Sequence, residues 1–169
     1  AMPSIIARIR RVFDLGTDVV AIAEHLKSDP LLRSSLSKRP GLRAPGAWDG
    51  FELAVRAILG QQVTVAAARK LAARLAETCG SEAIAITSAS SPRFALGPLR
   101  RAFPTAAEVA AADLSALGMP EARRRALCAM AHAALSDSQL FVPRESAEKT
   151  LERLLEIEGV GEWTAQYIA

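Results

Sequence analysis

The chain has 169 residues, half of them hydrophobic but only 5% aromatic, and a formal net charge of +3. This length allows one compact domain or two small lobes, and the predominance of alanine favours close-packed helices over a β-sandwich. No apolar run approaches the ~18 residues of a membrane span and no secretion signal opens the chain, which argues against membrane and secreted proteins and predicts a cytoplasmic one.

The first part of the chain is expected to form two helices followed by a linker. Residues 3–36 carry apolar residues at helical spacing on both sides of a break near Gly16. The following segment, "SKRPGLRAPGAWDG", contains two prolines and three glycines, which is typical of a linker. We therefore predict N-terminal helices and linker over residues 1–45 and a second helical domain over residues 46–169.

Capping residues mark the first helices of this second domain. Asp49 followed by Glu52 predicts a capping box, in which each side chain accepts a hydrogen bond from the other end of the first helical turn. That helix is expected to stop at the Gly-Gln-Gln sequence of residues 60–62. Another helix then runs from about Thr64 to a terminating Gly80.

The middle of the chain has a less regular pattern. Residues 81–102 are rich in Ser, Ala and Pro and predict a loop with some helical content. Thr105 and Glu108 form a second capping-box sequence. Pro120 suits the first position of a helix over residues 121–135.

The sequence "LLEIEGVGEWTAQYIA", residues 154–169, follows a helical pattern that starts near Ser146. Gly159 and Gly161 permit positive φ and close approach by another molecule. The amides of residues 160–163 are expected to be unpaired donors at a helix N-terminus, where the macrodipole also favours an anion. Such a helix-hairpin-helix can bind a phosphate, although a plain turn between two helices has a similar sequence.

Two aromatic residues follow this hairpin on one helical face, because Trp163 and Tyr167 are four residues apart. Both side chains can anchor the core, as aromatic residues usually do. Alternatively they form a wall on which a nucleobase stacks, worth ~1–3 kcal/mol per base. A cationic base would gain more through cation–π attraction.

Charged and metal-binding residue types give weaker signals. The basic residues are grouped within residues 8–11, 38–43 and 123–125, which indicates either solvated helix faces or a surface that binds a polyanion. The cysteines and histidines are isolated, so they predict neither a disulfide nor a metal site, and we expect no cofactor.

Three segments together resemble the helix-hairpin-helix base-excision DNA glycosylases. "LLEIEGVGEWTAQYIA" is similar to the hairpin of that superfamily. "RPGLRAPGAWDGFELAVRAILGQQVTVAAARKLAARL" and "FPTAAEVAAADLSALGMPEARRRAL" resemble its alkylation-repair branch, 3-methyladenine DNA glycosylase II. The resemblance implies an all-α helical bundle with a helix-hairpin-helix (HhH-GPD type), in which this chain holds an incomplete second helical lobe. It further implies a nucleoid-associated DNA repair enzyme that flips alkylated purines out of double-stranded DNA and hydrolyses the N-glycosidic bond, with no membrane role.

The same resemblance implies roles for particular residues. The base pocket would be lined by Trp163, Tyr167 and Gln61. DNA would be contacted by Gln62, Gly159, Val160, Gly161, Glu162 and Thr164, with Gln62 at the position of the wedge that fills the space left by the flipped base. The backbone carbonyls of Leu155, Ile157 and Val160 would hold a structural Na⁺ or K⁺ that bridges the hairpin to a phosphate.

Several departures from the family pattern change these expectations. Lyase-active relatives carry a lysine at the position of Trp163, so the tryptophan implies a monofunctional glycosylase. The catalytic aspartate of the family lies about twenty residues further on, beyond Ala169, so the chain by itself is expected to be inactive. Glu158 and Glu162 should weaken phosphate binding somewhat.

The resemblance also concerns parts that the chain is expected to lack. The closing helices of the family and its small N-terminal α/β domain are expected to be missing. Exposed apolar surface and self-association would be the consequence.

Three alternatives to this interpretation stay open at the level of the sequence. The first is a glycosylase for mismatched or oxidised bases. The second is a non-catalytic helix-hairpin-helix module that binds only the DNA backbone. The third is a helical interaction domain without a role in nucleic-acid binding.

Overall fold

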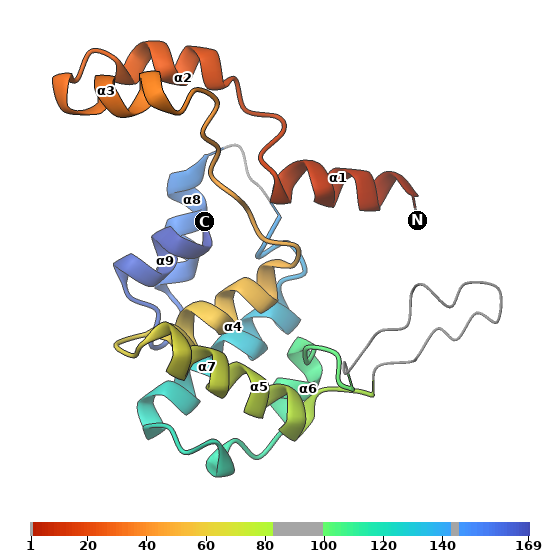
Figure 1. The fold of residues 1–169 in the computed structure, drawn as a ribbon. Helices are drawn as coiled ribbons and strands as arrows, with labels where there is room; N and C mark the ends of the chain where they lie inside the picture. Colours follow the sequence, from red (N-terminus) through yellow and green to blue (C-terminus); the bar gives the residue numbers. More distant parts are fainter. Residues whose placement is uncertain (1, 83–99, 143–145) are drawn as a thin grey trace. The chain divides into compact units, whose positions relative to one another are not determined.

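The computed structural model describes residues 2–82, 100–142 and 146–169, and all regular elements in these ranges are helices (Figure 1). A single isolated antiparallel bridge joins Glu82 to Arg101. The prediction of an all-α fold is confirmed. Among the described residues, no helix has the length and apolar character that crossing a membrane requires. The chain divides between Asp49 and Gly50 into two compact units.

The first unit contains three helices where the sequence predicted two. The expected second helix is interrupted because Asp29 caps a new one, its carboxylate accepting from the Leu31 amide at 2.8 Å, and Pro30 occupies the first helical position. No residue of these helices is buried. They are α1 (Met2–Val12), α2 (Val19–Leu26) and α3 (Pro30–Lys38).

Two arginines of the first basic group hold the linker onto α1. The Arg11 guanidinium donates to the carbonyl oxygens of Ala47 at 3.1 Å and Trp48 at 2.9 Å. The Arg8 guanidinium lies over the Trp48 ring, 5.5 Å from its centroid. Much of this basic group is therefore engaged within the unit rather than available to a polyanion.

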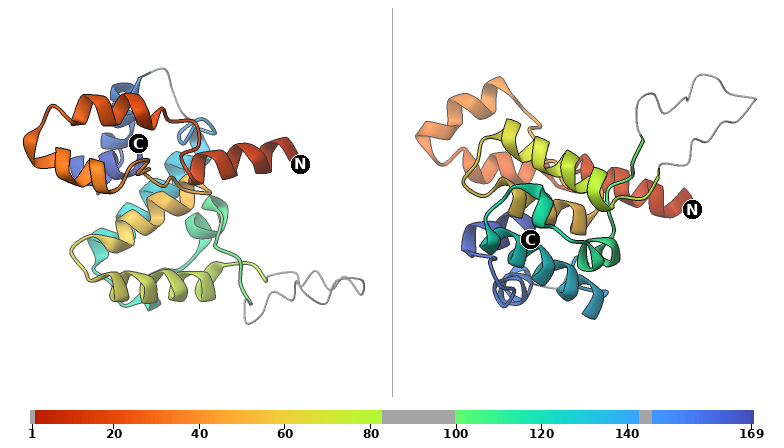
Figure 2. Two further views of the ribbon diagram at one scale, coloured as in Figure 1. Left: turned by 45° about the horizontal axis from the view of Figure 1, so that its top comes forward. Right: turned by 90° about the horizontal axis from the view of Figure 1, so that it is seen from below.

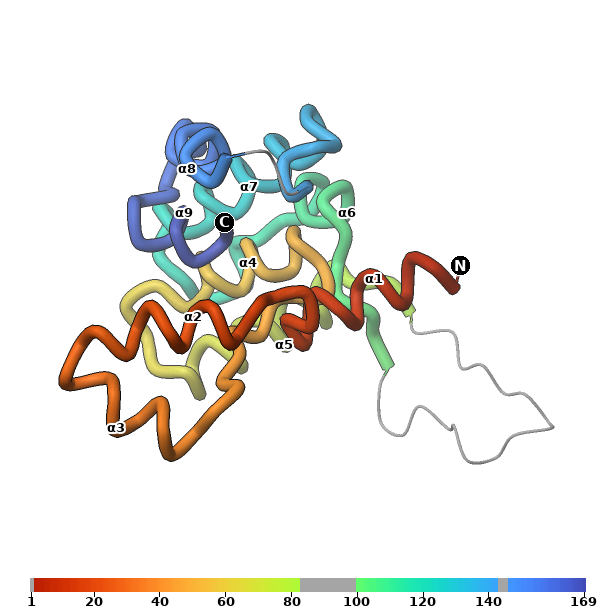
Figure 3. Tube along the Cα trace, turned by 90° about the horizontal axis from the view of Figure 1, so that it is seen from above, coloured from red at the N-terminus to blue at the C-terminus, as the bar shows by residue number. Residues whose placement is uncertain are grey.

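The second unit is built around α4, which lies in the middle of the other helices (Figure 3) and packs against α5, α7 and α9. Six of its eleven residues are buried, because neighbours cover it on several sides. Helices α8 and α9 lie side by side and are joined by the glycine hairpin (Figure 2). The elements are α4 (Gly50–Gly60), α5 (Val65–Cys79), α6 (Ala106–Ala111), the 3₁₀ turn η2 (Ser115–Leu117), α7 (Glu121–Ser136), α8 (Ala147–Leu155) and α9 (Glu162–Ile168).

Most predicted helix starts lie within one residue of the observed ones. The Thr105–Glu108 capping box is present with both of its reciprocal bonds, and Thr64 caps α5 through its hydroxyl. Pro120 differs slightly, since its backbone is extended and it precedes α7 as the capping residue rather than opening the helix. The loop predicted over residues 81–102 falls largely outside the described residues.

Candidate nucleic-acid interface

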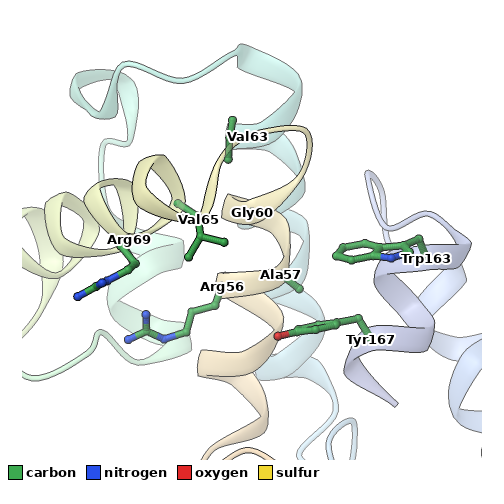
Figure 4. A pocket seen from close by; sticks show the side chains of 10 residues that line it. Arg56, Ala57, Gly60, Val63, Val65, Arg69, Trp163 and Tyr167 are labelled. Carbon is green, nitrogen blue, oxygen red and sulfur yellow. The ribbon is translucent and has the colours of Figure 1, made fainter. Parts of the chain in front are cut away.

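A cavity of about 300 Å³ lies between α4, the beginning of α5 and α9 (Figure 4). Trp163 and Tyr167 project from α9 toward the Ala57–Gly60 part of α4. Their rings are stacked, with centroids 5.4 Å apart and an interplanar angle of 16°. The lining residues are Arg56, Ala57, Gly60, Val63, Val65, Ala68, Arg69, Ala72, Trp163 and Tyr167.

The exposure of the two rings excludes one of the alternatives that the sequence left open, namely that they anchor the core. Trp163 is 63% exposed and Tyr167 54% exposed, so neither anchors the core. The face of α9 that packs inward carries Thr164, Ala165 and Ile168 instead. A small-molecule site typically has a volume of ~300–1,000 Å³ and an apolar lining, so this cavity is at the lower limit for one flat aromatic ligand.

Two arginines on the cavity wall were not among the predicted site residues. The Arg56 guanidinium pairs with Glu52 at 2.6 Å and lies 5.0 Å from the centroid of the Phe103 ring. Arg69 lines the same cavity from α5. Helical spacing from the Gly-Gln-Gln break is the sequence signal for both arginines, because it places them on the cavity side, one turn before Gly60 and one turn after Val65. No carboxylate is among the described residues that line the cavity.

The two glycines of the hairpin differ in whether the fold requires them. Gly159 has φ +80°, and a Cβ there would lie 2.4 Å from the Cβ of Ala126 on α7. Gly161 has φ −87° and no heavy atom within 4 Å of the place where its Cβ would be. The fold therefore requires glycine at 159 but not at 161. A methyl group at 161 would point into open space, where another molecule can approach the main chain.

The hairpin offers fewer free amides than the sequence predicted. The Val160 N–H donates to the Ile157 carbonyl at 3.0 Å, which closes a tight turn and removes one of the four expected donors. The amides of Gly161, Glu162 and Trp163 have no acceptor within the described part of the chain. Since α9 has only seven residues, the three N–H groups themselves, rather than a long macrodipole, are what could attract an anion.

Gln61 does not line the cavity, although the resemblance placed it in the base pocket. Its Nε2 donates to the carbonyl oxygen of Gly159 at 3.1 Å and to Oγ1 of Thr164 at 3.0 Å. Thr164 is only 3% exposed, so its side chain faces the protein interior. Gln62, by contrast, is exposed at the tip of the α4–α5 turn with φ +54°, a left-handed backbone conformation that is uncommon for glutamine.

The three carbonyls predicted to bind a monovalent cation differ in their hydrogen bonding. The Ile157 carbonyl accepts from Val160. No N–H of the described residues donates to the carbonyl oxygen of Leu155 or of Val160. Two of the three groups are thus free to act as ligands, which is compatible with the predicted site. Within the described ranges, no cluster of three His, Cys, Asp or Glu side chains could hold a metal.

Several charged residues next to the hairpin are bonded within the protein. Glu158 forms an ion pair with Arg125 at 3.1 Å, so one of the two carboxylates expected to weaken phosphate binding is partly neutralised. Arg123 donates to the Gln61 carbonyl at 2.6 Å, and Arg124 to that of Met119 at 3.1 Å. The basic group of residues 123–125 therefore supports the fold around the hairpin.

Comparison with known proteins relates both units to DNA repair enzymes. Residues 1–49 match the AlkA N-terminal domain family. The chain is 38% identical over 167 residues to DNA-3-methyladenine glycosylase 2 of Escherichia coli, covering 97% of this chain and 53% of that protein. It is 38% identical over 164 residues to the probable bifunctional transcriptional activator/DNA repair enzyme AlkA of Mycobacterium tuberculosis, covering 96% of this chain and 31% of that protein.

A solved structure shares the fold. The 3-methyladenine DNA glycosylase of Archaeoglobus fulgidus has a TM-score of 0.71 at 21% identity, over 99% of this chain and 55% of that one. The chain thus spans about half the length, or less, of the relatives it matches. The sequence resemblance is confirmed by these matches. This chain is therefore similar in sequence to DNA-3-methyladenine glycosylase 2, and it shares the fold of a solved 3-methyladenine DNA glycosylase.

Proposed function

We propose that this chain forms the DNA-binding and base-recognising part of a monofunctional base-excision glycosylase for alkylated purines, acting on genomic DNA in the cytoplasm. One observation carries the proposal. Two stacked aromatic rings, each more than half exposed, stand at the mouth of a cavity and directly follow the glycine hairpin in the chain. Exposing an indole and a phenol together is costly in water and is explained by a flat ligand that covers them.

Each part of the interface has a role in this proposal. The amides of Gly161, Glu162 and Trp163 bind one phosphate of the DNA backbone, which positions the protein without reading sequence. Gln62 enters the space that the flipped nucleotide leaves, and its amide bonds to the orphaned base. The flipped purine stacks against Trp163 and Tyr167. A base made cationic by alkylation is held more tightly than a neutral one, because the ring faces carry negative potential.

The residues of the cavity also limit the chemistry. Arg56 and Arg69 are the only cations on the described cavity wall, and a guanidinium does not form the Schiff base that a lyase reaction needs. Hydrolysis of the glycosidic bond of a cationic purine needs a carboxylate that stabilises the oxocarbenium-like sugar. Since no described residue on the wall supplies one, we propose that this carboxylate lies outside the described site and that residues 1–169 recognise without cleaving.

A monovalent cation fits the proposal as a structural element. Leu155 and Val160 have carbonyl oxygens without a donor in the described chain, and with Ile157 they could hold Na⁺ or K⁺ beside the phosphate-binding amides. Such a cation would supply positive charge toward the phosphate.

Binding to three duplexes of one sequence tests the proposal. One is undamaged, one contains a single 7-methylguanine, and one contains a tetrahydrofuran abasic analogue. We expect tighter binding of both modified duplexes, measured by fluorescence anisotropy, and an affinity that falls steeply as salt rises. Equal affinity for all three duplexes would contradict the proposed function and favour a module that binds only the DNA backbone. Binding insensitive to salt would also contradict it and favour a helical interaction domain.

A second measurement separates this proposal from a module that only binds the DNA backbone. That alternative is favoured by the absence of a carboxylate from the described cavity wall. A backbone-binding module would not distinguish 7-methylguanine from guanine, whereas stacking on the exposed rings does. Chromatography can detect whether the chain releases free 7-methylguanine from the modified duplex. Such release would show that a catalytic carboxylate is present.

A further inference from the structure

A hydrogen-bonded clasp joins the turn between α4 and α5 to the glycine hairpin. The Nε2 group of Gln61 has two hydrogens, and they bond to the carbonyl oxygen of Gly159 at 3.1 Å and to Oγ1 of Thr164 at 3.0 Å. These acceptors lie on opposite sides of the hairpin bend, and they are 98 and 103 residues away from Gln61 in the sequence. One side chain therefore sets the position of the turn relative to the hairpin.

The main chain of Gln61 is held as well. Its carbonyl oxygen accepts from Nη2 of Arg123 at 2.6 Å, and its N–H donates to the Ile58 carbonyl at 3.3 Å. Arg123 belongs to the first turn of α7, and the same helix carries Ala126, against which Gly159 is packed. Helix α7 thus supports both the turn and the hairpin, and Gln61 connects them directly.

The next residue in the chain is the predicted wedge. Gln62 is exposed and has the left-handed φ of +54°. A non-glycine residue keeps such a conformation where its surroundings hold it there. Because residue 61 is bound through both its side chain and its carbonyl, the clasp supplies that constraint and fixes the point from which the Gln62 side chain leaves the protein.

We propose that Gln61 is a positioning residue, which couples phosphate binding by the hairpin to insertion of Gln62 into the DNA. The inference rests on the proposed function, and it replaces the base contact that the resemblance implied for Gln61. When the hairpin binds a phosphate, the clasp holds Gln62 at a constant distance from that phosphate. Without the clasp, the turn and the hairpin move separately, and a displacement of ~1 Å is enough to impair such an arrangement.

The tetrahydrofuran duplex isolates this effect, because it contains no base that Gln61 could contact. A 2-aminopurine placed opposite the abasic analogue reports by its fluorescence whether the gap is filled. We expect Gln61→Met, which has similar length and no donor, to reduce the preference for the abasic duplex over the undamaged one by about tenfold. The 2-aminopurine signal of the complex should be lost, while affinity for undamaged DNA stays close to that of the wild type.

A double-mutant cycle separates positioning from a general loss of stability. In a Gln62→Gly background, which tolerates positive φ, Gln61→Met should cause no further loss, because its effect passes through the missing wedge. Thr164→Val removes one of the two side-chain bonds of Gln61 from the hairpin side. It should reproduce part of the effect of Gln61→Met, and it serves as the test variant if Gln61→Met unfolds. Gln166→Met, an exposed site on α9, is the matched control. Thermal unfolding of each variant establishes that it is folded.

Each outcome has one meaning. If the wild type prefers the abasic duplex, and Gln61→Met and Thr164→Val show the same preference as the wild type, the clasp is not a positioning device. Equal losses in the presence and absence of the Gln62 side chain would show a purely structural role and would likewise overturn the inference. If the wild type itself does not distinguish the abasic duplex, the proposed function fails, and the role of Gln61 fails with it.

Discussion

Alanine substitutions at the two hairpin glycines should have opposite effects on stability and on DNA binding. At Gly159, an alanine would adopt φ +80° and place its Cβ 2.4 Å from the Cβ of Ala126. The left-handed backbone costs ~1–2 kcal/mol, and forcing a methyl group into a packed contact costs ~1–3 kcal/mol more. The sum of roughly 2–5 kcal/mol is a large part of the ~5–15 kcal/mol by which a domain is stable, so Gly159→Ala should unfold at a clearly lower temperature.

At Gly161 the same change should leave the fold intact. With φ −87° and no heavy atom within 4 Å of the new Cβ, Gly161→Ala should be neutral or stabilise by ~0.4–1 kcal/mol through the unfolded chain. The methyl group would nevertheless stand where a phosphate must approach the amides. We expect at least about tenfold weaker binding to the abasic duplex, equivalent to ~1.4 kcal/mol, and a salt dependence reduced by about one phosphate contact.

Two measurements on the same preparations test this pair of predictions. Circular dichroism gives the unfolding temperature of each variant, and fluorescence anisotropy gives its affinity for DNA. Gly161→Asp is a stronger version of the second change, since it adds a negative charge to the bulk. If Gly161→Ala is stable and binds DNA as tightly as the wild type, no phosphate contacts these amides. If Gly159→Ala is as stable as the wild type, the hairpin does not pack on α7 as described.

Three further predictions concern the rings, the helix caps and the exposed apolar surface. Trp163→Ala removes a ring that is 63% exposed, so it should hardly change stability but should weaken binding of the 7-methylguanine duplex by ~1–3 kcal/mol; an unchanged anisotropy titration would exclude stacking. Thr105→Ala should destabilise the protein by ~0.5–2 kcal/mol in urea unfolding. The bonds from the backbone and the hydroxyl of Thr105 lower the pKa of Glu108 below its usual 4.5, so its contribution is present at neutral pH and is lost as the pH falls below about 4.5. The free energy of unfolding, measured from pH 7 to 3, should therefore change less with pH for Glu108→Gln than for the wild type. Parallel curves for the two proteins would refute this. Finally, because the three N-terminal helices bury none of their apolar residues, the chain should self-associate; a monomer in light scattering that binds no hydrophobic dye would contradict this.

Features that depend on a few neighbouring residues could be predicted from the sequence alone. The Thr105–Glu108 capping box and the cap at Thr64 are encoded within one helical turn, so no distant contact is needed to form them. The helix start at Asp29 and Pro30 is equally local, because aspartate followed by proline is a recognisable start signal, and it divides the helix that the apolar spacing alone predicted as continuous.

The direction in which each site residue faces was decided by the tertiary structure. The sequence established that Trp163 and Tyr167 share one helical face, but either face of α9 could have packed inward. Contacts of α9 with α4 and α8 selected the face of Thr164, Ala165 and Ile168, which left both rings exposed.

Gln61 and Gln62 also show the difference between what the local sequence determines and what tertiary packing determines. They are adjacent residues of the same type, yet they have different surroundings. The sequence by itself determined the helix break that holds both glutamines and the glycines of the hairpin, since these features follow from local backbone preferences. Only the tertiary structure turned one glutamine toward acceptors about a hundred residues away and left the other exposed. Such a bond depends on where two distant turns meet, and packing of the helices around α4 sets that meeting point.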